Sequence, residues 1–172
     1  MYFYPGLGKN GRFGNQMFQY ATLVSVARFN NSKAGVPIDV GSENDSYSRI
    51  HIYDAFPNLT AEKVTVDVMN SAKHDYIAKE GIDFNFEPSV FSSRDDCRLS
   101  GYFQSEKYFD MIRDEIKKEF TFHDNVQSKC KEVLDELKST TGGSKLCAVH
   151  FRRGDYTKLG HVHTNLDASY YN

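Results

Sequence analysis

Short apolar runs alternate with longer helical patterns along this chain, which is typical of α/β proteins. Apolar or alternating runs predict strands at residues 2–4, 36–40, 64–68, 82–86 and 98–103. Helical spacing of apolar residues predicts helices over residues 15–29, over residues 105–120 after a Ser105 cap, and over residues 124–137 after an Asp124 cap. Residues 146–151 form a last apolar run, which predicts a buried parallel strand.

The predicted strand 146–151 ends in a cluster of charged residues. Arg152 and Arg153 follow it directly, and Gly154 and Asp155 come next. Ligands of open α/β sheets bind at the carboxyl ends of strands, and paired arginines match the oxygens of a phosphate or diphosphate. The pattern predicts an anionic, phosphorylated ligand at the two arginines. It also fits a structural alternative, in which one arginine forms a salt bridge with Asp155 and the other is solvated.

A glycine-rich stretch, residues 6–14, joins the first predicted strand to the first predicted helix. Closely spaced glycines let backbone amides face a ligand, and a helix start adds the positive end of its dipole. Gly6, Gly8 and Gly11 match the spacing of the dinucleotide fingerprint, which leaves an NAD-dependent oxidoreductase as one alternative. That match is weak, because too many residues separate Gly11 from the helix and no well-placed acidic residue follows a second strand.

Composition narrows the function classes. The 172 residues are 40% hydrophobic and carry a formal charge of -2, which argues against binding nucleic acids or membrane surfaces through a basic face. Three cysteines, Cys97, Cys130 and Cys147, predict neither a disulfide framework nor a zinc site, and Cys147 is expected in the core. No stretch has transmembrane length. Either the protein works in a reducing cytoplasm, or a targeting segment lies outside this sequence.

Three motifs occur in order along the chain: GRFGNQMFQYA at residues 11–21, GYFQSEKYF at residues 101–109 and HFRRGDY at residues 150–156. Together they resemble the α-1,2-fucosyltransferases of glycosyltransferase family 11, and the first and third also resemble the protein O-fucosyltransferases. The resemblance spans nearly the whole chain. One position departs from the pattern, since Phe103 stands where many members have tryptophan.

The resemblance implies a two-lobed, GT-B-like enzyme that uses GDP-fucose as donor and needs no metal or other cofactor. The resemblance implies that Arg152, the first arginine of the third motif, binds the donor diphosphate. It also implies that the glycine loop lies in the cleft near the β-phosphate. His150, two residues before Arg152, would face the same side of a strand. By the same resemblance, the donor-binding residues are Arg12, Phe13, Gly14, Asn15, Arg152 and Arg153.

The chemistry of glycosyl transfer agrees with these residue types. Breaking a glycosyl–phosphate bond builds negative charge on the departing diphosphate, which a fixed guanidinium stabilises. Metal-dependent glycosyltransferases commonly bind the diphosphate through an Asp-x-Asp triplet, and this sequence contains none. The candidate catalytic residues are Arg152, His150 and Asp155. Asp155 could act as general base, although holding an arginine is its more ordinary role. His161 and His163 are interpreted as loop residues rather than metal ligands.

Residues 1–143 are expected to form an N-terminal α/β lobe with the glycine loop lining the cleft, and residues 144–172 to begin the Rossmann-like, GDP-fucose-binding lobe. The implied reaction is inverting transfer of L-fucose to a glycan hydroxyl, with an α-1,2 link to a terminal galactose. Because the second lobe would be incomplete, the 172-residue chain is expected to be an inactive fragment.

Two other readings stay open. One is a non-catalytic glycan- or nucleotide-binding relative, and the other is the oxidoreductase named above. The implied location is the cytoplasm for a prokaryotic or viral protein. For a eukaryotic protein it is the Golgi lumen, through a membrane anchor outside this sequence.

Overall fold

The computed structural model describes residues 1–38, 49–79, 85–151, 154–158 and 167–170 of the chain. Two compact units make up the structure, Met1–Gln127 and Ser128–Asn172, and each is described by itself. The sheet and nearly all buried side chains belong to the first unit.

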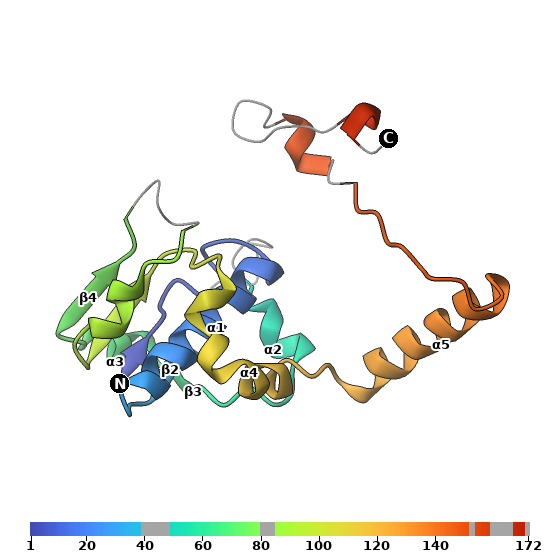
Figure 1. Ribbon diagram of the computed structural model, residues 1–172. Coiled ribbons are helices and arrows are strands. Elements are labelled where there is room, and N and C mark those ends of the chain that lie inside the picture. The colour runs from blue at the N-terminus through green and yellow to red at the C-terminus, as the bar shows by residue number, and fades with distance from the viewer. Residues whose placement is uncertain (39–48, 80–84, 152–153, 159–166, 171–172) are drawn as a thin grey trace. The chain divides into compact units, whose positions relative to one another are not determined.

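The first unit is built on a parallel sheet. Among the described residues its strands are β1 (Tyr2–Phe3), β2 (Ala34–Pro37), β3 (Glu62–Val64), β4 (His74–Ile77) and β5 (Cys97–Ser100). They lie in the order β3-β2-β1-β5-β4, and every neighbouring pair is parallel. The predicted α/β class is confirmed (Figure 1).

Helices connect and cover these strands. The α-helices are α1 (Phe13–Phe29), α2 (His51–Ala55), α3 (Val66–Asn70), α4 (Arg113–Glu119) and α5 (Asp124–Thr140). The shorter 3-10 segments are η1 (Pro88–Ser92), η2 (Glu106–Tyr108), η3 (Asp110–Ile112), η4 (Gly154–Lys158) and η5 (Ala168–Tyr170).

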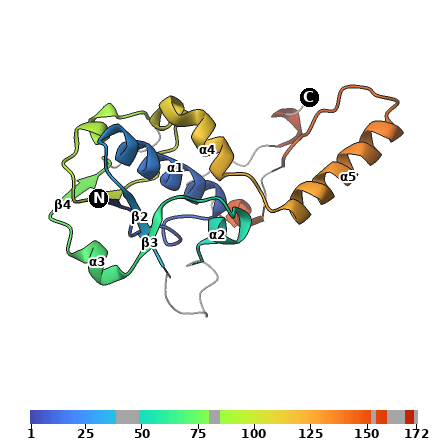
Figure 2. The same cartoon turned by 90° about the horizontal axis from the view of Figure 1, so that it is seen from below.

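A buried cluster lies on each face of the sheet, because successive strand residues point to opposite sides. Tyr2 and Tyr4 belong to the main cluster with Leu23 of α1, whereas Phe3 packs with Met69 of α3 on the other face. Figure 2 shows α1 and α4 on one side of the strands and α3 on the other. Helix α1 is enclosed on several sides, because every residue from position 19 to position 27 is buried.

Two predicted strands are corrected. The strand expected at 64–68 ends at Val64, because Thr65 caps α3 by accepting a hydrogen bond from the backbone N–H of Val68 at 3.5 Å. In the strand expected at 82–86, residues 82–84 lie outside the described residues, and Phe86 is not in a strand. The edge strand lies earlier, at β4, a polar run that alternation of apolar residues does not mark.

The helix expected over 105–120 is broken into η2, η3 and α4. Its start is confirmed, since the side chain of Ser105 accepts a hydrogen bond from the backbone N–H of Lys107. Tyr108, Ile112 and Ile116 are buried as the helical spacing predicts. The interruption keeps the apolar face inward while the backbone changes its winding.

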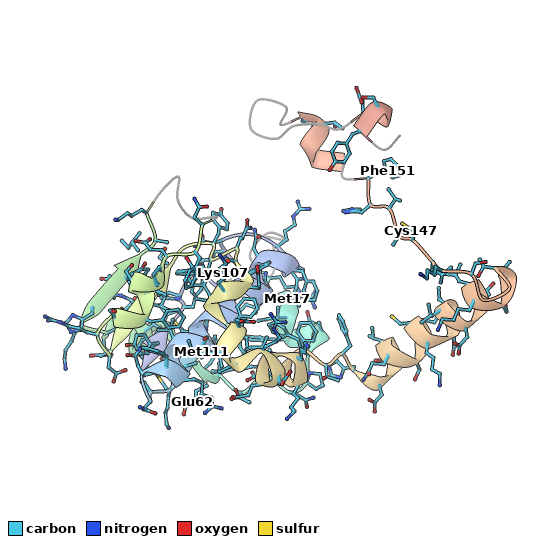
Figure 3. The ribbon with its side chains drawn as sticks, in the orientation of Figure 1. Met17, Glu62, Lys107, Met111, Cys147 and Phe151 are labelled. Atoms are coloured by element: carbon cyan, nitrogen blue, oxygen red, sulfur yellow. The ribbon has the colours of Figure 1, made fainter. Side chains whose placement is uncertain are left out.

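The second unit corrects the expectation of a buried strand at 146–151. These residues form no strand, and Leu146, Val149 and Phe151 are 44–57% exposed. A strand exists only where a neighbour supplies hydrogen bonds, and none of the described residues pairs with this segment. Cys147, expected in the core, is therefore exposed on an extended segment (Figure 3). Within the part of the chain that the structure describes, no helix is long and apolar enough to cross a membrane.

Candidate functional site

The first two motifs meet at the carboxyl ends of the central strands. β1 and β5 are parallel neighbours, so the glycine loop after β1 and residues 101–105 after β5 leave the sheet at the same edge. From β1 the chain continues to β2 and β3 on one side, whereas β5 and β4 lie on the other. Such a switch point is where open α/β sheets bind ligands.

A side-chain hydrogen bond joins the two motif loops. Gln104 donates from Nε2 to Oδ1 of Asn15 at 2.6 Å. Asn15 lies in the first turn of α1, and Gln104 follows the turn at the end of β5. Residues 89 positions apart in the sequence are thus fixed to each other where the site is expected.

Gly11 makes room for Asn15. Its φ of +96° lies in the left-handed region that favours glycine. A Cβ built on Gly11 would lie 2.1 Å from Nδ2 of Asn15 and 2.8 Å from its Cγ. The carboxamide of Asn15 therefore folds back over the loop and occupies the space that the missing side chain leaves.

Two buried glutamines hold the same loop through hydrogen bonds, and the sequence analysis predicted no role for them. Gln16 donates from Nε2 to the carbonyl of Arg49 at 2.8 Å and also reaches that of Gly11, whereas Gln19 donates to the carbonyl of Asn10 at 2.7 Å. Both glutamines are fully buried. The signal was present in the sequence: two amides three residues apart on one face of an otherwise apolar helix need partners when buried.

The turn after β5 has an unusual backbone that is held by aromatic packing. Gly101 has a φ of +151°, and Phe103 adopts a left-handed φ of +52° although it is not glycine. The ring of Phe103 is 1% exposed and packs edge-on against Tyr4 and Tyr108. Tyr4 also donates its hydroxyl to the carbonyl of Gly101, which ties the end of β1 to the end of β5.

A further tyrosine completes this aromatic packing. Tyr76 of β4 stacks on Phe103 with ring centroids 6.5 Å apart. Burial raises the pKa of the Tyr76 phenol, so the ring stays neutral at ordinary pH.

The other predicted donor-binding residues of the first motif occupy different environments. Arg12 is exposed at the N-cap of α1, and Gly14 is exposed in the first turn. Phe13 instead stacks on Phe56 with ring centroids 5.6 Å apart, which gives it a packing role. No acidic side chain stands in the first turn of α1. A guanidinium, a carboxamide and the helix dipole at one place suit an anion.

A mostly apolar cavity of about 480 Å³, whose lining also includes Glu106, Arg113 and Lys117, lies beside this helix start. Gly14, Met17 and Phe18 of α1 line one side, and Phe109, Ile116 and Phe120 line the other. Phe18 and Phe109 are in ring contact, with centroids 5.9 Å apart. Met17 is labelled in Figure 3, next to the η2–α4 segment. The cavity thus reaches Gly14, in the first turn of α1.

The third motif belongs to the second unit. His150 is exposed on the extended segment before the arginines, and Asp155 lies in η4. Arg152 and Arg153 lie outside the described residues, so their role stays a prediction. His161 and His163 also lie outside them. Among the described residues no three His, Cys, Asp or Glu side chains gather as a metal site would require.

Comparison with known proteins assigns the chain to a family. A model of glycosyl transferase family 11 matches residues 6–171. The chain belongs to glycosyl transferase family 11. The family 11 resemblance drawn from the three motifs is therefore confirmed, and the glycine loop, residues 101–109 and the third motif all lie within the matched region.

The chain is also similar to named fucosyltransferases. Galactoside alpha-(1,2)-fucosyltransferase 1 of Homo sapiens, of Gorilla gorilla gorilla and of Pan troglodytes are each 31% identical to this family 11 chain over 153 residues. The matches cover 87% of this chain and 39% of each relative, so the chain spans about 39% of the length of the relatives it matches. No solved structure matches the chain significantly.

Proposed function

We propose that this family 11 protein transfers L-fucose from GDP-fucose to a glycan hydroxyl with inversion at the anomeric carbon. The observation that carries the proposal is the family match over residues 6–171, whose first two motifs converge at the β1–β5 switch point. The relatives named galactoside alpha-(1,2)-fucosyltransferase support a galactoside acceptor and an α-1,2 link.

The residue types that the three motifs supply suit this reaction. The acceptor oxygen forms a bond to C1 of fucose as the bond from C1 to the β-phosphate oxygen breaks, and GDP leaves with the bonding electrons. Arg152, Arg12 and the first amides of α1 would stabilise the charge that develops on the diphosphate. The acceptor hydroxyl loses its proton to a base, for which Asp155 is the candidate carboxylate.

Metal independence is part of the proposal, because arginines and amide donors can neutralise a diphosphate without a cation. The test uses the product of the complete reading frame that encodes this sequence, with GDP-fucose and lactose. We expect GDP release and a fucosylated product in the presence of EDTA. Activity that EDTA abolishes and only Mn²⁺ or Mg²⁺ restores would overturn the metal-free mechanism. Binding of NAD in preference to GDP would overturn the proposed function.

Arg152 provides a residue-level test of the same function. Arg152→Ala should lower kcat by on the order of 10²–10³, because a charge-assisted contact to the leaving group is lost. Arg152→Lys should not restore activity, since a point charge cannot reproduce a two-pronged contact. Arg153→Ala is the matched control and should cost less. Equal and small losses from both alanine variants would show that the pair is structural.

A further inference from the structure

We propose that Gln104 is a positioning residue that orients Asn15, so that Asn15 presents N–H donors to the diphosphate of the nucleotide sugar. The inference rests on the proposed function and assigns a task to the second motif. Gln104 itself would not touch the donor; it would act through the carboxamide that it holds.

The inference rests on which side chain donates and which accepts in the hydrogen bond between Gln104 and Asn15. Gln104 donates from Nε2 to Oδ1 of Asn15 at 2.6 Å. A carboxamide has its oxygen and its NH₂ group on the same carbon, so fixing the oxygen on Gln104 turns the NH₂ group to the other side. A diphosphate only accepts hydrogen bonds. Asn15 is therefore useful to it in the orientation that Gln104 enforces, and a flipped amide would present an oxygen.

The NH₂ group of Asn15 lies at the right place for this task. It occupies the space beside Gly11, where a Cβ would come within 2.1 Å of Nδ2. Asn15 lies in the first turn of α1, beside the backbone amides at the positive end of the helix dipole. Its donors thus join a set of donors that already favours an anion.

Both ends of the hydrogen bond are held by rigid structure. Asn15 is part of the 17-residue helix α1, and the next residue in that helix, Gln16, is fully buried. Gln104 directly follows Phe103, whose left-handed backbone is held by its buried ring. The backbone N–H of Ser105 donates to the carbonyl of Phe103 at 2.8 Å, which closes the turn around Gln104. The strained turn after β5 therefore serves to aim one side chain.

A double-mutant cycle on the product of the complete reading frame tests the inference, with GDP and inorganic pyrophosphate as titrated probes. Gln104→Leu keeps the size of the side chain and removes the donor. It should weaken GDP binding on the order of tenfold. In an Asn15→Ala background the same substitution should change GDP affinity less than twofold, because Gln104 acts through Asn15. Gln127→Leu is the matched control, since the side chain of Gln127 donates to the nearby carbonyl of Phe122, away from both motifs, and the substitution should leave GDP binding unchanged.

Two further readouts separate positioning from a merely structural role. Asn15→Asp keeps an oxygen for Gln104 but replaces the NH₂ group by a second oxygen, so it should retain the melting temperature and lose GDP and pyrophosphate binding. In steady-state assays Gln104→Leu should raise KM for GDP-fucose while KM for the acceptor stays within twofold.

The possible outcomes distinguish the two proposals. If the wild-type protein binds neither GDP nor pyrophosphate, the proposed function and the inference fall together. If it binds GDP but the losses from Gln104→Leu and Asn15→Ala simply add, the inference is overturned and the proposed function stands. An equal rise of KM for donor and acceptor would also overturn the inference.

Discussion

At the scale of single residues, two glycines of one motif have opposite requirements. Gly11 has a φ of +96° and no room for a Cβ, whereas a Cβ on Gly14 would meet nothing within 4 Å. Gly11→Ala should destabilise the fold by roughly 1–3 kcal/mol, through backbone strain and displacement of Asn15. Gly14→Ala should be neutral or stabilising, because alanine suits a helix better than glycine.

Denaturant unfolding of the two variants side by side measures this contrast. In the Gly11→Ala variant the midpoint of denaturant unfolding should be lower. The side-chain amide signals of Asn15 should also move away from their native positions. Equal stability of the two variants would contradict the steric conflict between residues 11 and 15.

Cys97 allows a second prediction at this scale. It is 1% exposed, and burial raises the pKa of its thiol to about 11, so at pH 8 only about one molecule in a thousand carries the thiolate. Iodoacetamide at pH 8 should alkylate the exposed Cys130 and Cys147 in the native protein and spare Cys97. In urea all three should react. Mass spectrometry of tryptic peptides gives the answer, and early labelling of Cys97 would show that its strand opens readily.

The sequence revealed the residue types of the candidate site better than their contacts. Motif order pointed to Arg12, Asn15 and the glycines, and the structure gathers these at the start of α1. The partnership of Asn15 with Gln104 could not be read from spacing, because it depends on β5 lying next to β1. The packing role of Phe13 on Phe56 was also hidden, since ring contacts across 43 positions leave no local pattern.

At the scale of elements, a buried carboxylate ties three segments together. Glu119 at the end of α4 accepts a hydrogen bond from the Tyr20 hydroxyl of α1. It also accepts from the backbone N–H of Thr60 at 2.9 Å and from the Thr60 hydroxyl at 2.8 Å. Burial raises the pKa of Tyr20, so its hydroxyl keeps the proton that it donates.

Removing this carboxylate should loosen the contact between α1, α4 and the segment before β3. Glu119→Leu removes the acceptor of the buried Tyr20 hydroxyl and of the Thr60 hydroxyl, and we expect a loss of roughly 1–3 kcal/mol in the free energy of unfolding. Glu119→Gln is the control and should cost less, because an amide oxygen still accepts and the Thr60 hydroxyl can accept in turn. Urea denaturation distinguishes the variants; similar midpoints would show that the network adds little.

The elements that the sequence predicted well are those whose local pattern and tertiary setting agree. Helix α1 begins two residues before the predicted start, and β1 and β5 lie within or beside their predicted ranges. β4 escaped prediction because a polar edge strand is defined by its partner: Asp75 pairs with Arg98 across β4 and β5, with Nε and Oδ1 2.7 Å apart. Residues 146–151 were predicted wrongly for the converse reason, since an apolar run makes a strand only beside another strand.

At the scale of the whole molecule, burial is concentrated in Met1–Gln127. Helix α1 has ten buried residues, whereas α5 of equal length has none and leaves Val133, Leu134 and Leu137 at 41–48% exposure. A helix without packing is marginal in water and opens easily. Backbone amides of α1 should therefore exchange with deuterium at least about 100-fold more slowly than those of α5. Peptide-resolved exchange followed by mass spectrometry tests this, and strong protection of α5 would mean that its apolar stripe is covered in solution.

The order of the strands in the sheet also determines when each strand of a growing polypeptide can pair with its neighbours. β1 is made first, yet β5, which completes its second edge, begins only at residue 97. At about 5–20 residues per second a ribosome needs on the order of 5–20 s to deliver that partner. During this interval β1 can pair with β2 only, and its open edge is a template for unwanted pairing. Closing the long loop from β1 to β5 is also the entropically expensive step. The contact between the two motif loops is thus among the last to form in this sheet, and a nascent chain that has made it has completed the centre of its sheet.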